Sequence, residues 1–365
     1  MKILSINTKS KKYNIYIGHN IIAQFSKIIK KEKIKFKKSL IVVDKNIPNK
    51  FLNKLYSKIK CEKKLIFHFD SSEKNKNFIN VNSIIEKLFI NNFSRNDVII
   101  CFGGGIAGDV SGFAASIYKR GLKFVNIPST LLSQVDSSIG GKTGVNNKFG
   151  KNLIGSFYQP DLVISDSLLL RSLPRREIIC GYAEILKHSL IKNKKFFLYL
   201  NENLKNILLL KKKFINKAIV ESCKIKKQIV EKDEKEINLR KSLNLGHTFG
   251  HAYEATLNYS KKLNHGEAVL YGILSAAKFS AKLNFLNKYN YKLILSHLSN
   301  LGFVNLNKFF KKKDLNKIIS FMISDKKNIT NKINLITIKK IGSVNTSKQF
   351  DSIKVKKFIN SLLIE

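Results

Sequence analysis

Three of the seven histidines in this chain fall within nineteen residues, at His247, His251 and His265. His247 and His251 are four apart, so a helix would carry both on one face. A catalytic zinc ion is commonly held by two histidines and one carboxylate, with a fourth position left open for water or substrate. Spacing alone nominates His247 and His251 as the ligand pair, although a single histidine is more often a structural residue.

A candidate carboxylate lies in the segment GYAEILKH, where Glu184 and Lys187 are three residues apart. This spacing places both on one face of the helix that we expect there. The segment therefore adds an acidic and a basic group to the histidine cluster.

A glycine-rich segment, GGGIAGD at 103–109, follows an expected strand and leads into an expected helix over 110–120. It matches G-x-G-x-x-G, in which a pyrophosphate rests on the N-terminus of a helix. The acidic residue that ordinarily follows about 20 residues later is missing, because that region reads IPST. We expect a nucleotide site of another type, in which Asp44 holds the ribose; a plain tight turn is the alternative.

The segment QVDSSIGGKTG at 134–144 resembles a phosphate-binding P-loop only superficially. The P-loop pattern requires glycine where Asp136 stands, and a carboxylate there would repel phosphate. We exclude the P-loop and expect a Gly-Gly turn that presents Lys142 to an anion, with Lys151 and Asn152 nearby. The alternative is a solvated loop with ordinary surface lysines.

Strands alternate with helices in the first half of the chain, which predicts a parallel α/β domain. After Pro174 the apolar residues recur at helical spacing, which predicts a mostly α-helical second domain. We place the domains at 1–172 and 173–365. The expected strands are 39–44, 64–69, 97–102 and 123–127, with a helix over 81–90 and a late hairpin at 333–338 and 342–344.

The composition is strongly basic, with 67 Lys and Arg against 25 Asp and Glu, a net charge of +42. Such a balance suits a nucleic-acid or anionic-membrane partner. The lysines are spread along the chain rather than interleaved with aromatics, so we favour a genome-wide drift in codon usage. Nine of the nineteen glycines fall between Gly103 and Gly144, where the lysine excess nearly vanishes. This contrast indicates a site with a constrained backbone.

The four cysteines form no CxxC pair, which fits a reducing compartment and argues against a disulfide framework. The first seven residues alternate like a strand and contain no signal-peptide apolar core. No apolar run approaches the ~20 residues that a membrane span needs. We expect a cytoplasmic protein with no membrane and no specific nucleic-acid partner.

Six segments together resemble the 3-dehydroquinate synthases, and they occur in that family's order between about 100 and 270. They are GGGIAGDVSGFAASIYKRG, IPSTLLSQVDSSIGGKTGVN, GKNLIGSFYQP, LPRREIICGYAEILKHSLI, LRKSLNLGHTFGHAYEA and LNHGEAV. Weaker likeness extends to YNIYIGHNI near the start and SDKKN near the end. The resemblance implies an α/β nucleotide-binding domain followed by a mostly helical metal-binding domain.

The resemblance also implies a role for each matching residue. Zinc or cobalt would be held by Glu184, His247 and His265, which replaces the pair nominated by spacing. The substrate pocket would contain Asp136, Lys142, Asn152, Lys187, Lys226, Arg240, Asn244 and His251. NAD would contact Asp44, Glu73, Lys76, Gly104, Gly105, Asp109, Ser129, Thr130, Lys142 and Lys151. Arg120 would reach into the site of a second subunit of a homodimer, and Lys326 or Lys327 would contact the substrate.

The activity that this resemblance implies is the conversion of 3-deoxy-D-arabino-heptulosonate 7-phosphate to 3-dehydroquinate and phosphate, in the shikimate pathway of aromatic amino-acid synthesis. NAD oxidises the substrate transiently, phosphate is eliminated, NADH returns the hydride, and an aldol closure forms the ring. The enzyme is then a lyase without net redox change, and the substrate's own phosphate is one candidate for the elimination base.

Two related activities are the main alternatives. A sugar-phosphate cyclase of secondary metabolism would share the fold and cofactors but act on a different sugar phosphate. An enzyme like glycerol dehydrogenase would share the architecture, would lack the basic pocket and would release NADH. The complete set of Arg240, Asn244, His247 and His251 favours the shikimate enzyme.

Overall fold

The computed structural model describes residues 1–324 and 332–364. These residues form two compact units, which we describe separately. The first contains Met1–Gly181 and Lys205–Lys235, and the second contains Tyr182–Leu204 and Glu236–Glu365. The domain boundary at 172 and 173 stays a prediction.

A seven-stranded sheet forms the centre of the first unit, in the order β1-β2-β9-β6-β5-β3-β4. Its strands pair in parallel except for β1 and β2, which form an antiparallel hairpin. A separate antiparallel pair is formed by β7 and β8. The strands are β1 Lys2–Asn7, β2 Lys12–Gly18, β3 Lys38–Asp44, β4 Lys63–Phe69, β5 Val98–Gly103, β6 Lys123–Pro128, β7 Lys142–Asn147, β8 Gly150–Phe157 and β9 Leu162–Asp166.

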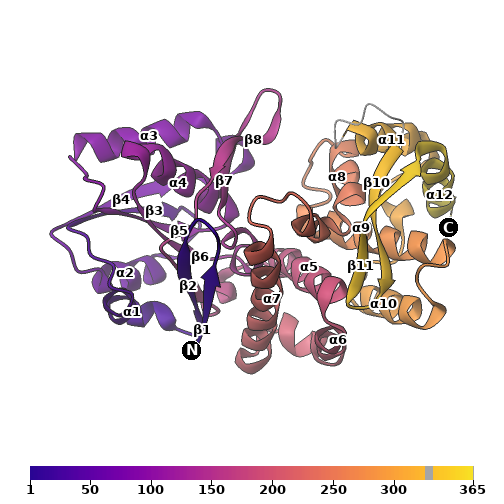
Figure 1. The fold of residues 1–365 in the computed structure, drawn as a ribbon, viewed down its shortest axis with the longest axis horizontal. Helices are drawn as coiled ribbons and strands as arrows, with labels where there is room; N and C mark the ends of the chain where they lie inside the picture. Colours follow the sequence, from indigo (N-terminus) through magenta and orange to yellow (C-terminus); the bar gives the residue numbers. More distant parts are fainter. Residues whose placement is uncertain (325–331, 365) are drawn as a thin grey trace. The chain divides into compact units, whose positions relative to one another are not determined.

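Helices cover both faces of this sheet (Figure 1). Alternate residues of one strand point to opposite faces, so Ile41 and Val43 of β3 pack in one apolar core and Leu40 and Val42 in the other. The first core includes α1 (Phe25–Lys31) and α2 (Asn49–Lys58), and the second includes α3 (Phe78–Ile90) and α4 (Gly105–Ile117). Burial on both faces explains the continuous β-branched runs in these strands.

The predicted strands are confirmed with small shifts at their ends, and α3 contains the expected helix. The helix predicted over 110–120 is partly wrong, because α4 begins at Gly105 and ends at Ile117. The glycine segment itself forms the first turn of this helix. Lys119 and Arg120 have positive φ angles of 46° and 63°, which an α-helix does not accommodate.

The second unit is mostly helical, as predicted, and the late hairpin is confirmed as β10 (Lys332–Lys340) paired with β11 (Ser343–Asp351). No helix among the described residues is both long enough and apolar enough to span a membrane. Helices α5 and α6 each contain residues of both units, and α7 belongs to the first. The helices are α5 Arg175–Lys192, α6 Lys194–Leu208, α7 Lys212–Lys232, α8 His247–Thr256, α9 His265–Lys282, α10 Lys288–Asn300, α11 Leu315–Ser324 and α12 Ser352–Ile364.

Helices α8 and α9 approach each other closely because glycine replaces a side chain at their contact. A Cβ atom on Gly272 of α9 would lie 2.0 Å from the carbonyl oxygen of Gly246, the residue before α8. No side chain tolerates that distance, so the close approach requires glycine. The first residues of these two helices are His247 and His265.

Asp97 ties together the starts of β3 and β5, two neighbouring strands. It is buried and accepts hydrogen bonds from the backbone N–H groups of Lys38 (2.8 Å), Lys37 (3.2 Å) and Ser94 (2.7 Å). Burial acts to raise the pKa of this carboxyl, but the hydrogen bonds outweigh it and the pKa is lowered. The charged form is therefore the one that stabilises the fold.

We expect Asp97→Asn to destabilise the chain by about 2 kcal/mol at neutral pH, because an amide group would meet backbone donors that need acceptors. The carboxylate contributes fully above its unfolded pKa of about 4, and this contribution is lost as the pH falls through the lowered folded value. Urea unfolding at several pH values measures this effect. The difference in unfolding free energy between the two proteins should shrink below pH 5, and a constant difference would contradict the assignment.

Candidate metal centre and nucleotide site

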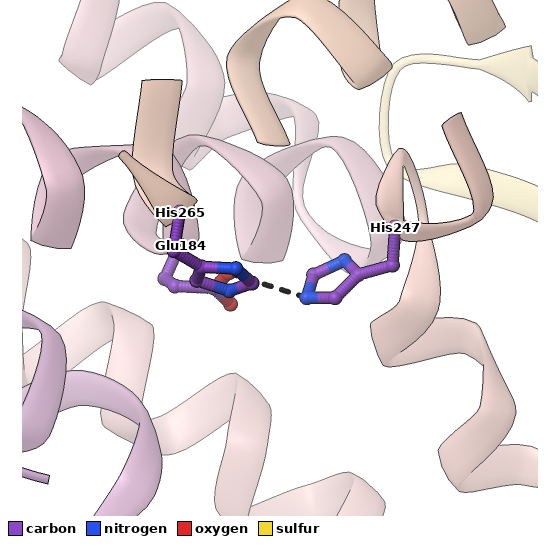
Figure 2. A group of neighbouring side chains, drawn as sticks. All are labelled: Glu184, His247 and His265. Carbon is purple, nitrogen blue, oxygen red and sulfur yellow. Dashed lines mark ion pairs between the residues drawn. The ribbon is translucent and has the colours of Figure 1, made fainter. Parts of the chain in front are cut away.

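Glu184, His247 and His265 come together in the second unit, although up to 81 residues separate them in sequence. One ligand atom from each lies within 4.8 Å of the others. Figure 2 shows the three side chains, from α5, α8 and α9, directed toward one another. Two imidazoles and one carboxylate form a donor set suited to catalytic zinc.

The carboxylate of Glu184 is almost completely buried, with 1% of the residue exposed. Its Oε2 forms an ion pair with the Lys187 ammonium, and its Oε1 lies 3.7 Å from Nε2 of His247. Apart from this ion pair, neither oxygen has a hydrogen-bond donor among the residues that the structure describes. A buried carboxylate in this condition is costly, and a bound cation would satisfy it. The site therefore fits a divalent metal ion.

The two histidines differ in their electrostatic surroundings. Burial lowers the pKa of His247 well below its ordinary value, and the positive charge of Lys187 lowers it further. Burial also acts to lower the pKa of His265, but the hydrogen bond and charge of Glu254 outweigh it, so the net shift is upward. A neutral imidazole offers a nitrogen lone pair to a metal, and His247 meets this requirement at neutral pH.

His251 does not join the first group, although its spacing from His247 suggested a ligand pair. It forms a second group with Glu254 and His265. The centroids of the His247 and His251 rings are 5.3 Å apart, so His251 still lies beside the candidate metal centre. Sequence reasoning missed Glu254, whose spacing of three from His251 and seven from His247 places it on the same helical face.

In the first unit, the predicted nucleotide residues meet at the carboxyl edge of the sheet. Val43 pairs with Phe102, so Asp44 and Gly103 end neighbouring parallel strands. Gly104 then caps α4 and Gly105 begins it, with the backbone N–H groups of the first turn available to an anion. Ser129 and Thr130 follow the next strand, β6, and the Ser129 N–H donates to the Gly103 carbonyl at 2.8 Å. This is the geometry that binds a pyrophosphate.

A polar cluster lies beside α4 in the same unit. The ammonium of Lys76 contacts Asp109 Oδ2 and Asn152 Oδ1, each at 2.5 Å. Asn146, which sequence reasoning missed, donates from Nδ2 to Glu73 Oε1 at 2.7 Å and accepts from the Asn152 N–H at 2.9 Å. Lys151 lies 3.8 Å from the same oxygen of Glu73. Only the folded chain could reveal Asn146, because its spacing in the sequence carries no signal.

Burial marks several of the predicted site residues. Among the described residues, only three lysines are buried, namely Lys76, Lys187 and Lys226. Each forms an ion pair with a carboxylate, and Lys226 contacts Asp136 Oδ1 at 2.6 Å. Lysine is rarely buried without a partner or a function. In a chain with so many surface lysines, these three positions stand apart and all belong to the predicted site.

The predicted turn before Lys142 is present. Gly140 and Gly141 have φ angles of 99° and 66°, and Lys142 begins β7 with an exposed side chain. The turn rests on the buried amide of Gln159, whose Nε2 donates to Glu234 Oε1 at 2.8 Å. A Cβ atom on Gly141 would lie 2.7–2.9 Å from that amide group.

The three remaining predicted site residues that the structure describes are Arg120, Arg240 and Asn244. Arg120 is exposed just beyond the end of α4. Arg240 is buried, and Asn244 donates to Glu236 at 3.2 Å in the segment before α8. Lys326 and Lys327 lie outside the described residues.

Two family models match this chain, and their matches meet between Cys180 and Gly181. Residues 66–180 match the 3-dehydroquinate synthase N-terminal model, and residues 181–328 match the 3-dehydroquinate synthase C-terminal model. The chain belongs to the 3-dehydroquinate synthase family. The resemblance inferred from the six sequence segments is thereby confirmed.

Individual 3-dehydroquinate synthases match over nearly the whole chain. The one from Pelagibacter ubique is 56% identical over 361 residues, which cover 99% of this chain and 98% of the relative. The one from Dictyoglomus thermophilum is 40% identical, with 94% of each chain covered. A crystal structure of 2-deoxy-scyllo-inosose synthase, complexed with carbaglucose-6-phosphate, NAD+ and Co2+, shares the fold with a TM-score of 0.86. That structure is 25% identical and covers 99% of this chain and 100% of its own.

We expect Gly141→Ala to destabilise the chain and displace Lys142, because the new methyl group would collide with the Gln159 amide. Gly302→Ala is the matched control, since Gly302 has a φ angle of 87° but no atom within 4 Å of its added Cβ. Gly302→Ala should lose only about 1–2 kcal/mol of unfolding free energy, because a residue with a Cβ atom is strained at a positive φ angle. Thermal unfolding measures both losses, and equal losses would show that contact with Gln159 does not matter.

Proposed function

We propose that this chain converts 3-deoxy-D-arabino-heptulosonate 7-phosphate to 3-dehydroquinate and phosphate in the shikimate pathway. The observation that carries the proposal is the 56% identity to a 3-dehydroquinate synthase over 99% of the chain. The candidate metal ligands and the glycine turn supply the two cofactor sites that this reaction needs. The reaction class is a carbon–oxygen lyase that eliminates phosphate.

The metal would be held by Glu184, His247 and His265, and zinc and cobalt both suit this donor set. Bound there, a divalent cation would lower the pKa of a substrate hydroxyl. Lys187, buried against Glu184, supplies a positive charge beside the centre. His251, whose ring lies beside that of His247, would bind substrate or handle a proton.

NAD would bind in the first unit, with its pyrophosphate at Gly104 and Gly105 and a ribose at Asp44. Its nicotinamide would accept a hydride and later return it. Further contacts would come from Asp109, Lys76, Glu73, Lys151, Ser129, Thr130 and Lys142. The ion pair between Lys76 and Asp109 holds both side chains in fixed positions beside the start of α4. These residues would orient the nucleotide, and Lys142 would also bind the substrate.

The substrate carries a carboxylate and a phosphate, and both are recognised by cations. Lys142, Lys226, Arg240 and Lys187 would bind these anions, and Asn152 and Asn244 would hydrogen-bond to hydroxyl groups. Asp136 holds the Lys226 ammonium at 2.6 Å, so the cation is oriented before substrate arrives. Pre-oriented charges stabilise developing charge without reorganisation. The same lysine and arginine side chains would stabilise the negative charge of the phosphate as it leaves.

The first test incubates metal-loaded protein with the heptulosonate phosphate and catalytic NAD. We expect phosphate and 3-dehydroquinate in equal amounts without accumulation of NADH, because the hydride is returned in each turnover. A chelator should abolish both products, and added zinc or cobalt should restore them.

A neutral hexose phosphate is the matched control substrate, because it keeps the phosphate and lacks the carboxylate. Faster turnover of this control would contradict the proposal and favour a related sugar-phosphate cyclase. Accumulation of NADH on a simple polyol would favour a dehydrogenase.

We also propose that the protein is a homodimer in which Arg120 binds the substrate phosphate of the partner's site. Phe149 and Leu153, at the tip of the β7–β8 hairpin, are 79% and 61% exposed. Ser156 of β8 donates to Ser116 of α4 at 2.9 Å, so the hairpin lies beside the end of α4 that precedes Arg120. An exposed apolar surface of this kind favours a protein partner, and a second copy fits the role of Arg120.

A complementation experiment tests the shared site. Arg120→Ala and Lys226→Met subunits are co-expressed with different tags, and the mixed dimers are purified. Each pure variant should be inactive, and the mixed dimer should regain about half of the wild-type activity, because one of its two sites is intact. If Arg120 acts in its own subunit, both sites of the mixed dimer are defective and activity stays absent. A monomer in light scattering would overturn the proposal directly.

None of the four cysteines forms a disulfide, which supports a reducing compartment. We therefore propose that the enzyme works in the cytoplasm.

A further inference from the structure

We infer that Glu254 is a positioning residue for the metal centre: its carboxylate holds the imidazole of His265 so that the ring's other nitrogen faces the metal. Glu254 Oε2 lies 3.0 Å from Nδ1 of His265. The inference rests on the metal site of the proposed function. It adds a fourth residue, Glu254, which acts on the ligand His265 and not on the metal.

The argument begins with the two nitrogens of one imidazole ring. A neutral histidine carries one proton, so one nitrogen donates and the other offers a lone pair. A carboxylate at Nδ1 keeps the proton there, which leaves Nε2 with the lone pair that a metal ion can take. Carboxylates in this arrangement commonly fix both the tautomer and the orientation of a metal-binding histidine.

The surroundings of Glu254 suit this role. The residue is 9% exposed, so bulk water screens the contact little. It lies on α8, two turns after His247, whereas His265 begins α9. One carboxylate thus links the helix of one histidine ligand to the imidazole of the other. The close contact of these helices at Gly272 makes this reach possible.

A rival arrangement is a metal held directly by His251, Glu254 and His265, whose ligand atoms also lie within 4.8 Å of one another. The short Nδ1 contact opposes it, because a nitrogen that donates to a carboxylate has no lone pair for a metal. The buried carboxylate of Glu184, whose partner among the described residues is the Lys187 ammonium, also favours the first group. A decisive test must therefore separate positioning from direct ligation.

The experiment measures the affinity of the apoprotein for Zn2+ by competition with a chromogenic chelator. We compare the wild type with Glu254→Leu, which removes the acceptor, and Glu254→Gln, which keeps an acceptor oxygen without the charge. The expected loss for Glu254→Leu is about ten- to hundredfold. Glu254→Gln should recover much of this loss, because its amide oxygen still accepts the Nδ1 proton.

Glu267→Gln is the matched control. Glu267 is a carboxylate of the same α9 first turn, two residues after His265, but it accepts from the Asn264 N–H at 2.9 Å in a capping box. Its substitution removes the same charge, and the glutamine keeps an oxygen that can accept from the Asn264 N–H. The Zn2+ affinity of Glu267→Gln should stay within about twofold of wild type. This is well below the loss of about tenfold or more that we expect for Glu254→Leu.

Visible absorption of the Co2+-loaded proteins separates the two arrangements. At saturating Co2+, Glu254→Gln should keep the wild-type bands, since the coordinating atoms are unchanged. Altered bands would mean that Glu254 binds the metal directly, and this would overturn the inference. Unchanged Zn2+ affinity in Glu254→Leu, with lower thermal stability, would reduce Glu254 to a structural residue and would also overturn it.

Failure of the metal site itself gives a different result. A wild-type protein that binds neither Zn2+ nor Co2+ would overturn the metal centre, and the inference with it. The effect of Glu254 is the ratio of the Zn2+ affinities of the wild type and the variant. This ratio is measured without any turnover of substrate, so it does not depend on which reaction the enzyme catalyses.

Discussion

The second unit is organised around one buried carboxylate. Glu184 lies on α5 with 1% of its surface exposed, and a charge removed from water in this way needs strong compensation. Lys187, one turn later on the same helix, supplies a positive charge, and the candidate ligands His247 and His265 approach from two other helices. A divalent cation bound at this group would complete the compensation. The helices α8 and α9 begin at the two histidines.

Helix packing then determines how well the ligands meet. The glycines at the contact of α8 and α9 let the two backbones approach, and the capping box of Asn264 and Glu267 fixes where α9 starts. Capping also satisfies backbone donors that would otherwise compete for nearby acceptors. The ligands therefore stand on rigid helical positions instead of on loops, and Glu254 adds a hydrogen bond that fixes one ring.

The first unit follows a different rule, set by its parallel sheet. Asp97 aligns the starts of β3 and β5, and the same two strands end at Asp44 and Gly103. The helix α4 begins at once, so its N-terminus lies at the edge where the strands end. Ligands of open parallel sheets bind at this edge, because loops and helix N-termini gather there.

The sequence by itself determined the family, the parallel α/β character of the first half, the helical second half and the types of residue at the site. It could do so because strand and helix periods, glycine turns and ligand-bearing segments are local patterns. It placed α4 too late, since the glycine run reads as a turn although it forms the first helical turn.

Tertiary structure decided which local candidates meet. Spacing paired His247 with His251, whereas folding brings His247 to Glu184, 63 residues earlier, and to His265 on the next helix. It also revealed Asn146 beside Glu73 and Glu254 beside His265. The burial of Lys76, Lys187 and Lys226 could not be read from a lysine-rich sequence, because burial depends on contacts between distant segments. Spacing in the sequence shows which residues share one face of a helix. Only the packing of helices and strands decides which of these faces contact one another.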